Sequence, residues 1–303
     1  MEDVVIKADH LTKDYGYGRG TFDLNFEVRR GEIFGYVGTN GSGKTTTIRQ
    51  MMGFLKPTSG SITVLGKDAW AETTAIKRFT SYVPGEIAFP DLPTGTEFLK
   101  VQAEYLGVTD MSYANRLIRD LQLDPSANLK RMSKGMKQKT AIVAALMGDR
   151  DVLILDEPTT GLDPLMREVF ISAILEEKAK GKTVFMSSHI YQEIEDTCDR
   201  VALIRDGRIV DIADMNDIRH HDVKTFRLGF LGKADYDDFR AKYSRIEAEY
   251  PDKLHLTVDV DDSGINAFFS LLSGYQLTYL SEIKYTLEKH FAGIFKGVTE
   301  NEQ

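Results

Sequence analysis

Apolar residues in the first two hundred positions follow two patterns that are typical of β-strands. Residues 4–8 and 22–28 alternate apolar and polar side chains, as half-buried strands do. Short continuous apolar runs between polar turns, at residues 152–155 and 183–186, predict central strands of a parallel sheet. The short apolar run at residues 33–37 is a predicted strand that ends in a Gly-rich turn. Residues 62–65 are a further predicted strand. This part of the chain is therefore expected to contain a sheet with a parallel core.

Helical spacing of apolar residues appears between and around these strands. The predicted helices are residues 48–55, 98–106, 113–121, 133–147 and 167–180. Three of them fall in the segment from about 85 to 148, which we interpret as a helical subdomain inserted into the sheet. The helix over 167–180 lies between two buried strands and is expected to cross over between them. The fold class predicted for residues 1–213 is α/β.

From residue 214 onward, strand-like and helix-like segments alternate over shorter distances. The strand-like segments are residues 224–231, 253–260 and 276–283, and the helix-like segments are residues 236–243, 265–272 and 287–295. This pattern predicts a separate small α+β domain over residues 214–303.

Composition narrows the classes of function. The chain has 303 residues with a formal net charge of −8, which argues against a dedicated nucleic-acid-binding protein. Its single cysteine, Cys198, rules out an intrachain disulfide. No apolar run approaches the about 18 residues needed to span a bilayer, and the N-terminal residues do not resemble a signal peptide. We therefore expect a soluble, cytoplasmic chain, with any membrane part supplied by another chain.

Residues 38–45 fit the pattern G-x-x-x-x-G-K-[ST] between a predicted strand and a predicted helix. In such a loop, backbone N–H groups and a helix N-terminus face a phosphate, the lysine reaches the β- and γ-phosphates, and the hydroxyl after it binds Mg²⁺. A Gly-rich turn that matches by chance is the alternative, and the strand and helix on either side make it improbable. The predicted nucleotide-binding residues here are Gly38, Thr39, Asn40, Gly41, Ser42, Gly43, Lys44, Thr45 and Thr46.

Two carboxylates, Asp156 and Glu157, follow the buried strand at 152–155. Parallel sheets place ligands at the carboxyl ends of their strands, where these acids are expected. Asp156 suits a direct or water-bridged partner of Mg²⁺, together with Thr45, and Glu157 suits a base for the water that attacks the γ-phosphate. An acidic pair after a strand is more often a helix cap or a solvated turn. Because a phosphate loop lies upstream in this chain, a role in the nucleotide site is the preferred interpretation of this acidic pair.

Three further motifs occur in a fixed order around these elements. Met-Ser-Lys-Gly-Met at 132–136 opens a predicted helix, Thr-Gly-Leu-Asp-Pro at 160–164 follows the carboxylates, and Ser-Ser-His at 187–189 ends the next strand. In this order the chain resembles the ATP-binding cassette (ABC) family of ATPases over about residues 1–212. The resemblance implies a P-loop NTPase core of the ABC type, with a helical subdomain, and ATP and Mg²⁺ as its cofactors.

The resemblance also implies roles for individual residues. Lys44, Glu157 and His189 match the family's catalytic lysine, general base and γ-phosphate contact. Tyr15 matches the aromatic residue that stacks on adenine, and Tyr17 is a nearby rival for that role. The family's signature and its linking loop act on ATP bound by a second cassette; here they correspond to Ser133, Lys134, Gly135 and Asp163.

The chain departs from the family pattern at two places. Gly85 stands where the family usually has glutamine, and Glu86 beside it is a candidate for that missing metal contact through a water. The signature has Lys134 and Met136 in place of the usual glycine and glutamine. This variant resembles bacterial exporter-type cassettes that pair with six-helix membrane subunits for drugs, peptides or lipids.

The resulting hypothesis is the ATP-hydrolysing subunit of an exporter, peripheral on the inner face of the cell membrane. Its expected partners are a transmembrane permease, docked near residues 85–99, and a second ABC subunit; no nucleic acid is expected. One alternative is a soluble cassette ATPase of translation or DNA maintenance, although the single cassette and the lack of a long coiled coil argue against it. Another is a degenerate cassette that only binds or regulates.

Overall fold

The computed structural model describes residues 3–220 and 222–300, which form two compact units. The first unit is Met1–Met215 and the second is Asn216–Gln303. The outer ends of the two predicted domains, residues 1 and 303, lie outside the described residues. None of the described helices is both long enough and apolar enough to cross a membrane.

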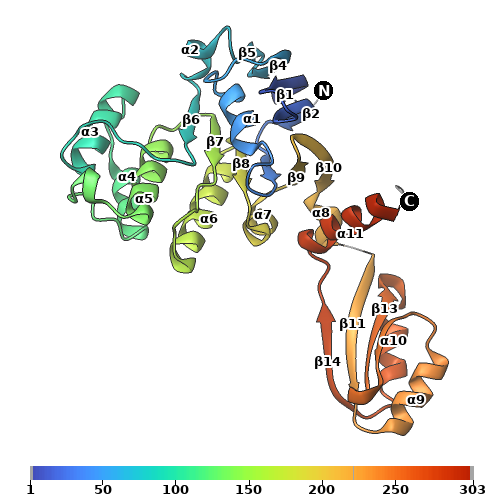
Figure 1. Cartoon of the computed structure of the whole chain (residues 1–303). Helices are drawn as coiled ribbons and strands as arrows, with labels where there is room; N and C mark the ends of the chain where they lie inside the picture. Colours follow the sequence, from blue (N-terminus) through green and yellow to red (C-terminus); the bar gives the residue numbers. More distant parts are fainter. Residues whose placement is uncertain (1–2, 221, 301–303) are drawn as a thin grey trace. The chain divides into compact units, whose positions relative to one another are not determined.

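A six-stranded sheet in the order β10-β9-β3-β8-β7-β6 forms the centre of the first unit (Figure 1). Its strands are β3 (Ile33–Val37), β6 (Thr80–Val83), β7 (Val152–Asp156), β8 (Thr183–Ser188), β9 (Arg200–Arg205) and β10 (Arg208–Asp214). All residues of β3, β7 and β8 are buried, so the two predicted central strands are confirmed as β7 and β8, and the predicted strand at 33–37 is a third buried strand. All neighbouring strands are parallel except β9 and β10, which form an antiparallel hairpin.

The parallel pairing brings distant parts of the chain to one edge. β8 lies between β3 and β7, and its last residues pair Val37 with Ser188 and Asp156 with Ser187. The segments that leave these three strands therefore emerge side by side, at the carboxyl edge where parallel sheets hold ligands.

A second, antiparallel sheet in the order β2-β1-β4-β5 covers the helix after the phosphate loop. It contains β1 (Val4–Asp14), β2 (Gly20–Arg29), β4 (Ser59–Val64) and β5 (Lys67–Asp68). We predicted three of these strands, two of them from alternating patterns, but not that they form a sheet of their own. Aromatic rings from β2, β3 and β8 pack between the sheets, with Phe185 5.2 Å from Tyr36 between ring centroids.

The helix after the phosphate loop is displaced from its predicted position. We predicted a helix over 48–55, and α1 is Lys44–Met51. It begins earlier because α1 starts directly from the phosphate loop and packs against β4 and β7, which outweighs the weak helix propensity of the threonines at 45–47. It ends earlier because Gly53 has a φ of 66°, which is characteristic of a helix C-terminus.

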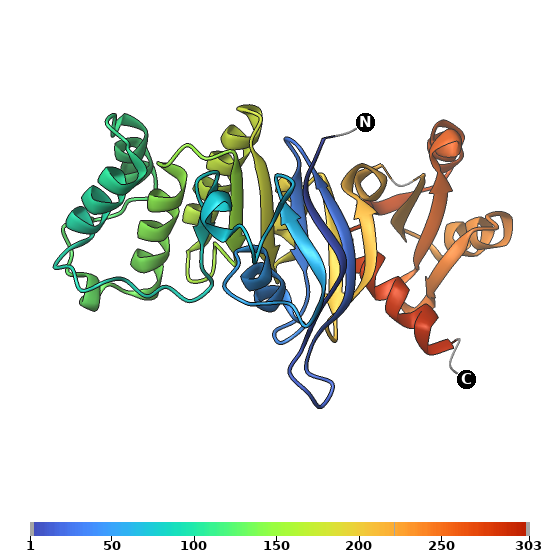
Figure 2. The same cartoon turned by 90° about the horizontal axis from the view of Figure 1, so that it is seen from above.

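Three helices form the predicted helical subdomain to one side of the six-stranded sheet (Figures 1 and 2). They are α3 (Gly95–Leu106), α4 (Ser112–Asp120) and α5 (Lys134–Leu146), with the short η1 (Leu129–Arg131) before α5. Residues 84–94 carry no helix, although we predicted helical structure from residue 85. Prolines 84, 90 and 93 explain this, since each removes a backbone donor and disfavours a helix before it.

The remaining helices of the first unit are α2 (Thr73–Ile76), α6 (Pro164–Ala179) and α7 (Tyr191–Thr197), and α8 (Met215–Arg219) starts at its last residue. α6 is the predicted crossover helix between β7 and β8. Its first turn is fixed by Asp163, whose carboxylate accepts a hydrogen bond from the Met166 N–H at 3.0 Å.

The second unit is a four-stranded antiparallel sheet in the order β12-β13-β11-β14, with two helices packed on it. Its elements are β11 (Val223–Phe230), α9 (Lys233–Lys242), β12 (Ile246–Tyr250), η2 (Pro251–Lys253), β13 (His255–Asp261), η3 (Asp262–Gly264), α10 (Ile265–Leu272), β14 (Leu277–Ile283) and α11 (Leu287–Glu300). Phe239 of α9 and Phe268 of α10 belong to one core with Leu228 and Val258 of the sheet. The three predicted strands and three predicted helices are confirmed.

We did not predict β12. Its sequence, Ile-Glu-Ala-Glu-Tyr, contains Glu and Ala, which are depleted in strands, and it lies at the edge of the sheet with no fully buried residue. Pairing with β13 therefore decides its conformation.

Candidate functional site

The loop between β3 and α1 has space for glycine alone at two of its positions. A Cβ at Gly38 would lie 2.3 Å from the carbonyl oxygen of Ile204. Gly43 has a φ of 113°, and a Cβ there would lie 2.8 Å from Thr21 Cγ2. Gly43 also precedes the first turn of α1, whose N–H groups have no partners within the helix. The loop and helix therefore form an anion-binding cradle.

Lys44 lies inside this cradle, with its side chain 5% exposed. Its Nζ donates to the carbonyl oxygens of Gly38 at 2.6 Å and Thr39 at 3.2 Å. It also pairs with Glu157 Oε1 at 3.2 Å. A buried cation with these partners is positioned to bind a phosphate that enters the loop.

Asp156 ends β7 and is completely buried. Its Oδ1 accepts from Ser187 Oγ at 2.7 Å, while Oδ2 has no hydrogen-bond partner among the described residues. Burial raises the pKa of Asp156, although the hydrogen bond from Ser187 and the nearby Thr45 hydroxyl oppose the increase. A buried carboxylate oxygen without a partner fits a metal cation, which would restore the charged form.

Glu157 has a φ of 48°, in the left-handed region that costs a non-glycine residue about 1–2 kcal/mol. Its N–H donates to Ser187 Oγ at 3.0 Å, which holds this conformation. Its Oε2 lies 3.2 Å from His189 Nδ1. Burial works to raise the pKa of Glu157, but the charge and hydrogen bond of Lys44, aided by His189, outweigh it and lower the pKa. The three predicted catalytic residues therefore meet in one place.

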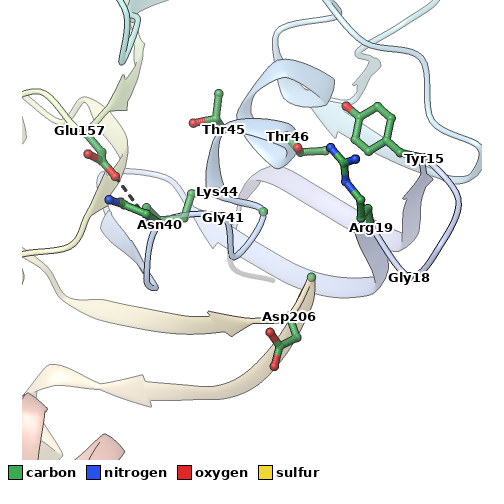
Figure 3. A pocket seen from close by; sticks show the side chains of 13 residues that line it. Tyr15, Gly18, Arg19, Asn40, Gly41, Lys44, Thr45, Thr46, Glu157 and Asp206 are labelled. Atoms are coloured by element: carbon green, nitrogen blue, oxygen red, sulfur yellow. Dashed lines mark ion pairs between the residues drawn. The ribbon is translucent and has the colours of Figure 1, made fainter.

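A pocket of about 480 Å³ is lined by Lys44 and Glu157 of this cluster but not by His189 (Figure 3). The predicted residues that line it are Tyr15, Asn40, Gly41, Gly43, Lys44, Thr45, Thr46 and Glu157. Gly38, Thr39 and Ser42 do not line it; the carbonyl oxygens of Gly38 and Thr39 accept hydrogen bonds from Lys44, and Ser42 is buried.

The turn between β1 and β2 closes one end of the pocket and distinguishes the two tyrosines. Tyr15 lines the pocket, whereas Tyr17 is fully exposed and does not. Tyr15 N–H donates to the Arg19 carbonyl at 2.9 Å, and this turn also places the Arg19 side chain on the pocket wall (Figure 3). We did not predict Arg19, nor Gly18, Gly20, Asp206 and Gly207, which also line the pocket. Arg19 has a glycine on each side in the sequence, and this pattern could have indicated that the turn contributes to the site.

The residues predicted to act on a second nucleotide do not line this pocket. The Ser133 hydroxyl caps α5 by accepting from Met136 N–H at 3.2 Å, and Asp163 caps α6. A Cβ at Gly135 would lie 2.7 Å from the Gly161 carbonyl oxygen, so the first turn of α5 packs on the loop before α6. That these residues and Lys134 act on ATP bound by another cassette stays a prediction.

Gly85 and Glu86 lie next to the acidic end of the site. A cavity of about 110 Å³ is lined by both residues together with Thr45 and Asp156. A Cβ at Gly85 would lie 3.2 Å from Asp156 Oδ2, so a larger residue would crowd that oxygen. The described residues contain no cluster of three or more His, Cys, Asp or Glu side chains that could hold a metal ion by themselves. A metal here would therefore take most of its ligands from phosphate and water, as Mg²⁺ commonly does.

The sequence matches the family described as ABC transporter over residues 21–160. The chain is 34% identical over 238 residues to the bacitracin transport ATP-binding protein BcrA of Bacillus licheniformis, covering 76% of this chain and 77% of the relative. It is 34% identical over 219 residues to the linearmycin resistance ATP-binding protein LnrL of Bacillus subtilis, covering 71% and 70% of the two chains.

Solved structures give the same result for the fold. The chain superposes on the ATP binding subunit of an ABC transporter with a TM-score of 0.64 and 32% identity, over 71% of this chain and 92% of the other. It superposes on the ATP-binding cassette MJ0796, a dimer bound to ADP and phosphate, with a TM-score of 0.62 and 22% identity, over 69% and 98% of the chains. The second likeness concerns the fold alone.

Proposed function

This chain belongs to the ABC transporter family, and from that premise we propose that it powers an exporter as its ATP-hydrolysing subunit. Members of this family bind and hydrolyse ATP, and this chain is such an ATPase. The convergence of Lys44, Glu157 and His189 at one sheet edge is the observation that carries the catalytic proposal. The functions for which the two relatives are named, bacitracin transport and linearmycin resistance, favour a drug or peptide as cargo over a role in translation or DNA maintenance.

In the structure, Lys44 is paired with the proposed base, Glu157. When ATP enters, the β- and γ-phosphates attract Lys44 and the N–H groups at the start of α1. Glu157 then loses the pairing that lowers its pKa, so its carboxylate becomes more basic when the attacking water is present. His189, 3.2 Å from Glu157, is placed to contact the γ-phosphate, and Tyr15 stacks on adenine.

Thr45 and Asp156 are the residues we propose to hold Mg²⁺ with the nucleotide, and Glu86 is placed to add a contact through water. The metal would neutralise charge that develops on the phosphates. The unpartnered Oδ2 of Asp156 supports this assignment.

ABC ATP-binding subunits dimerise and work with membrane permeases, and we propose that two cassettes close head to tail in this case. Ser133, Lys134, Gly135 and Asp163 of one cassette would then reach the ATP held by the other, a copy or a relative of this chain. This arrangement places the chain on the inner face of the membrane, beside its permease.

A groove of about 300 Å³ is the proposed docking site for a cytoplasmic helix of the permease. It lies between β6, the irregular segment that follows β6, and helices α3 and α5. Apolar and aromatic side chains dominate its wall, including Phe54, Tyr82, Phe89, Phe98 and Tyr105. Tyr105 is 82% exposed and belongs to this contiguous apolar wall, where a docked helix would cover it. The residues that line the groove include part of the predicted docking region at 85–99, together with residues that come before and after it in the sequence.

Affinity purification of the tagged chain from detergent-solubilised membranes tests the transporter assignment. We expect a multi-helix membrane protein to accompany the chain in fixed proportion. Tyr105→Ser should weaken this association by about tenfold or more, because a buried aromatic anchor is lost. Tyr17→Ser, the same change at an exposed tyrosine outside the groove, is the control. Recovery of ribosomal or DNA-bound partners in place of a membrane protein would contradict the proposal.

Arg19 gives a test of how the nucleotide lies in the pocket. Arg19→Met should raise the Kd for ATP about five- to tenfold, because a charge-assisted contact with the triphosphate is lost. Equilibrium titration with ATP measures the change, and Tyr17→Ala in the same turn should leave the Kd unaltered. An unaltered Kd in Arg19→Met would place the triphosphate away from this wall.

A further inference from the structure

A buried carboxylate lies behind the proposed catalytic residues and takes no part in the mechanism above. Glu193, in α7, is 1% exposed. Its Oε1 accepts from Thr159 Oγ1 at 2.6 Å, and its Oε2 accepts from Ser188 Oγ at 2.9 Å. Arg167 Nε lies 2.9 Å from Oε1 and forms an ion pair with it. Leaving a buried charge without such partners is strongly destabilising, so these contacts are expected to be maintained.

The three partners come from three segments, each next to a residue that we predicted to act in the site. Thr159 follows Glu157 by two residues, and Ser188 immediately precedes His189. Arg167 lies in the first turn of α6, where its N–H donates to the Asp163 carbonyl at 3.0 Å. The Glu193 carboxylate therefore links three segments. These are the residues after Glu157, the residues before His189, and helix α6, which follows the linking loop.

In the described part of the chain, backbone pairing between β7 and β8 reaches only as far as Glu157, whose N–H donates to the Ser187 carbonyl oxygen at 3.2 Å. The ladder between β7 and β8 ends at Asp156 and Ser187, one residue before Glu157 and two before His189. Beyond that point, the separation of the two side chains depends on how their flanking segments are fixed. The bridge from Thr159 through Glu193 to Ser188 crosses between those two segments.

We propose that Glu193, neutralised by Arg167, is a positioning residue for ATP hydrolysis. It holds Glu157 and His189 in the alignment that the attacking water and γ-phosphate require, and it ties the loop at 160–163 to the same framework. It touches neither nucleotide nor water itself. This inference rests on the proposed function, since it concerns the efficiency of the same site.

Steady-state ATP hydrolysis by the full-length chain, together with equilibrium ATP binding, tests the inference. Glu193→Gln keeps the shape of the side chain but removes its charge. Arg167→Met removes the countercharge from a side chain that is 30% exposed and therefore tolerates replacement more easily. Glu177→Gln is the matched control. Glu177 is also completely buried on α6 and accepts from Tyr113 at 2.6 Å and Lys180 at 2.7 Å, but it does not line the nucleotide pocket.

We expect Glu193→Gln to lower kcat about 10- to 100-fold, because small displacements of catalytic groups have effects of this size. The Kd for ATP should stay within about twofold, since the phosphate loop is untouched. Glu177→Gln should lower the melting temperature without a comparable fall in kcat. Ser188→Ala should lower kcat in the wild-type background and have little further effect in Glu193→Gln, because both changes break the same bridge.

The outcomes separate this inference from the proposed function. Absence of ATP hydrolysis by the wild-type chain and its permease complex would overturn the proposed function. Wild-type turnover with an unchanged kcat in Glu193→Gln would overturn the positioning role alone. So would an equal fall in kcat in Glu177→Gln, which would show a general loss of stability. If Glu193→Gln does not fold, an unchanged kcat in Arg167→Met would have the same meaning.

Discussion

Replacing Glu157 with glutamine is expected to reduce ATP turnover by about 10²- to 10⁴-fold, the usual contribution of a general base. Glutamine has nearly the same shape and can retain the left-handed backbone that the Ser187 contact holds. It cannot accept a proton from water at neutral pH. ATP binding should be retained, because Lys44 and the loop that holds the phosphates are unchanged.

The same variant should accumulate as a closed dimer with ATP. In the proposed cycle hydrolysis releases the dimer, so a chain that binds ATP without hydrolysing it is expected to shift the equilibrium toward the closed form. Size-exclusion chromatography with and without ATP and Mg²⁺ measures this shift. Glu176→Gln, at a partly exposed acid on α6 that pairs with Arg116, should leave turnover and dimerisation unchanged. Normal hydrolysis in Glu157→Gln would exclude this residue as the base.

Lys44→Met should abolish tight nucleotide binding, with the Kd for ATP raised by about a hundredfold or more. The change removes a nearly buried cation whose contacts to phosphate are worth about 3 kcal/mol together. Thermal unfolding offers a direct measurement. ATP at about a hundred times its Kd should stabilise the wild-type chain by about 2.7 kcal/mol, and the same ATP concentration should stabilise the variant by only about 0.4 kcal/mol or less.

A second lysine provides the control for this experiment. Lys182 is 8% exposed and pairs with Glu177 and Asp149, so Lys182→Met also removes a nearly buried cation. It should reduce stability without affecting the increase in melting temperature that ATP produces. A full ATP-induced shift in Lys44→Met would show that the nucleotide does not use the phosphate loop.

Much of the site could be predicted from the sequence because its chemistry is concentrated in short segments. The loop at 38–45 contains its glycines, lysine and threonine in one stretch, and the structure folds them into the expected cradle. Asp156, Glu157 and His189 each follow an apolar strand directly, and the rule for parallel sheets predicts the edge at which they emerge.

Residues whose role depends on distant partners could not be predicted in this way. Arg19 lies in an exposed turn, and only the folding of that turn over the phosphate loop places it on the pocket wall. In the sequence, Glu193 does not differ from other acids in amphipathic helices. Its role follows from the hydrogen bonds that Thr159 and Ser188 donate to its carboxylate in the folded chain. The edge strand β12 has a composition that disfavours a strand, and its pairing with β13 overrides that preference.

The sequence by itself determined the nucleotide chemistry, the α/β class of the first unit and the family resemblance, because these depend on periodicity and on motifs within a few residues. The tertiary structure alone decided which tyrosine reaches the pocket, how Lys44 pairs with Glu157, and which buried carboxylate joins the base to the histidine. These features depend on strand register and on side chains that meet across long separations in sequence. Local propensities do not contain that information, since burial and pairing are properties of the assembled fold.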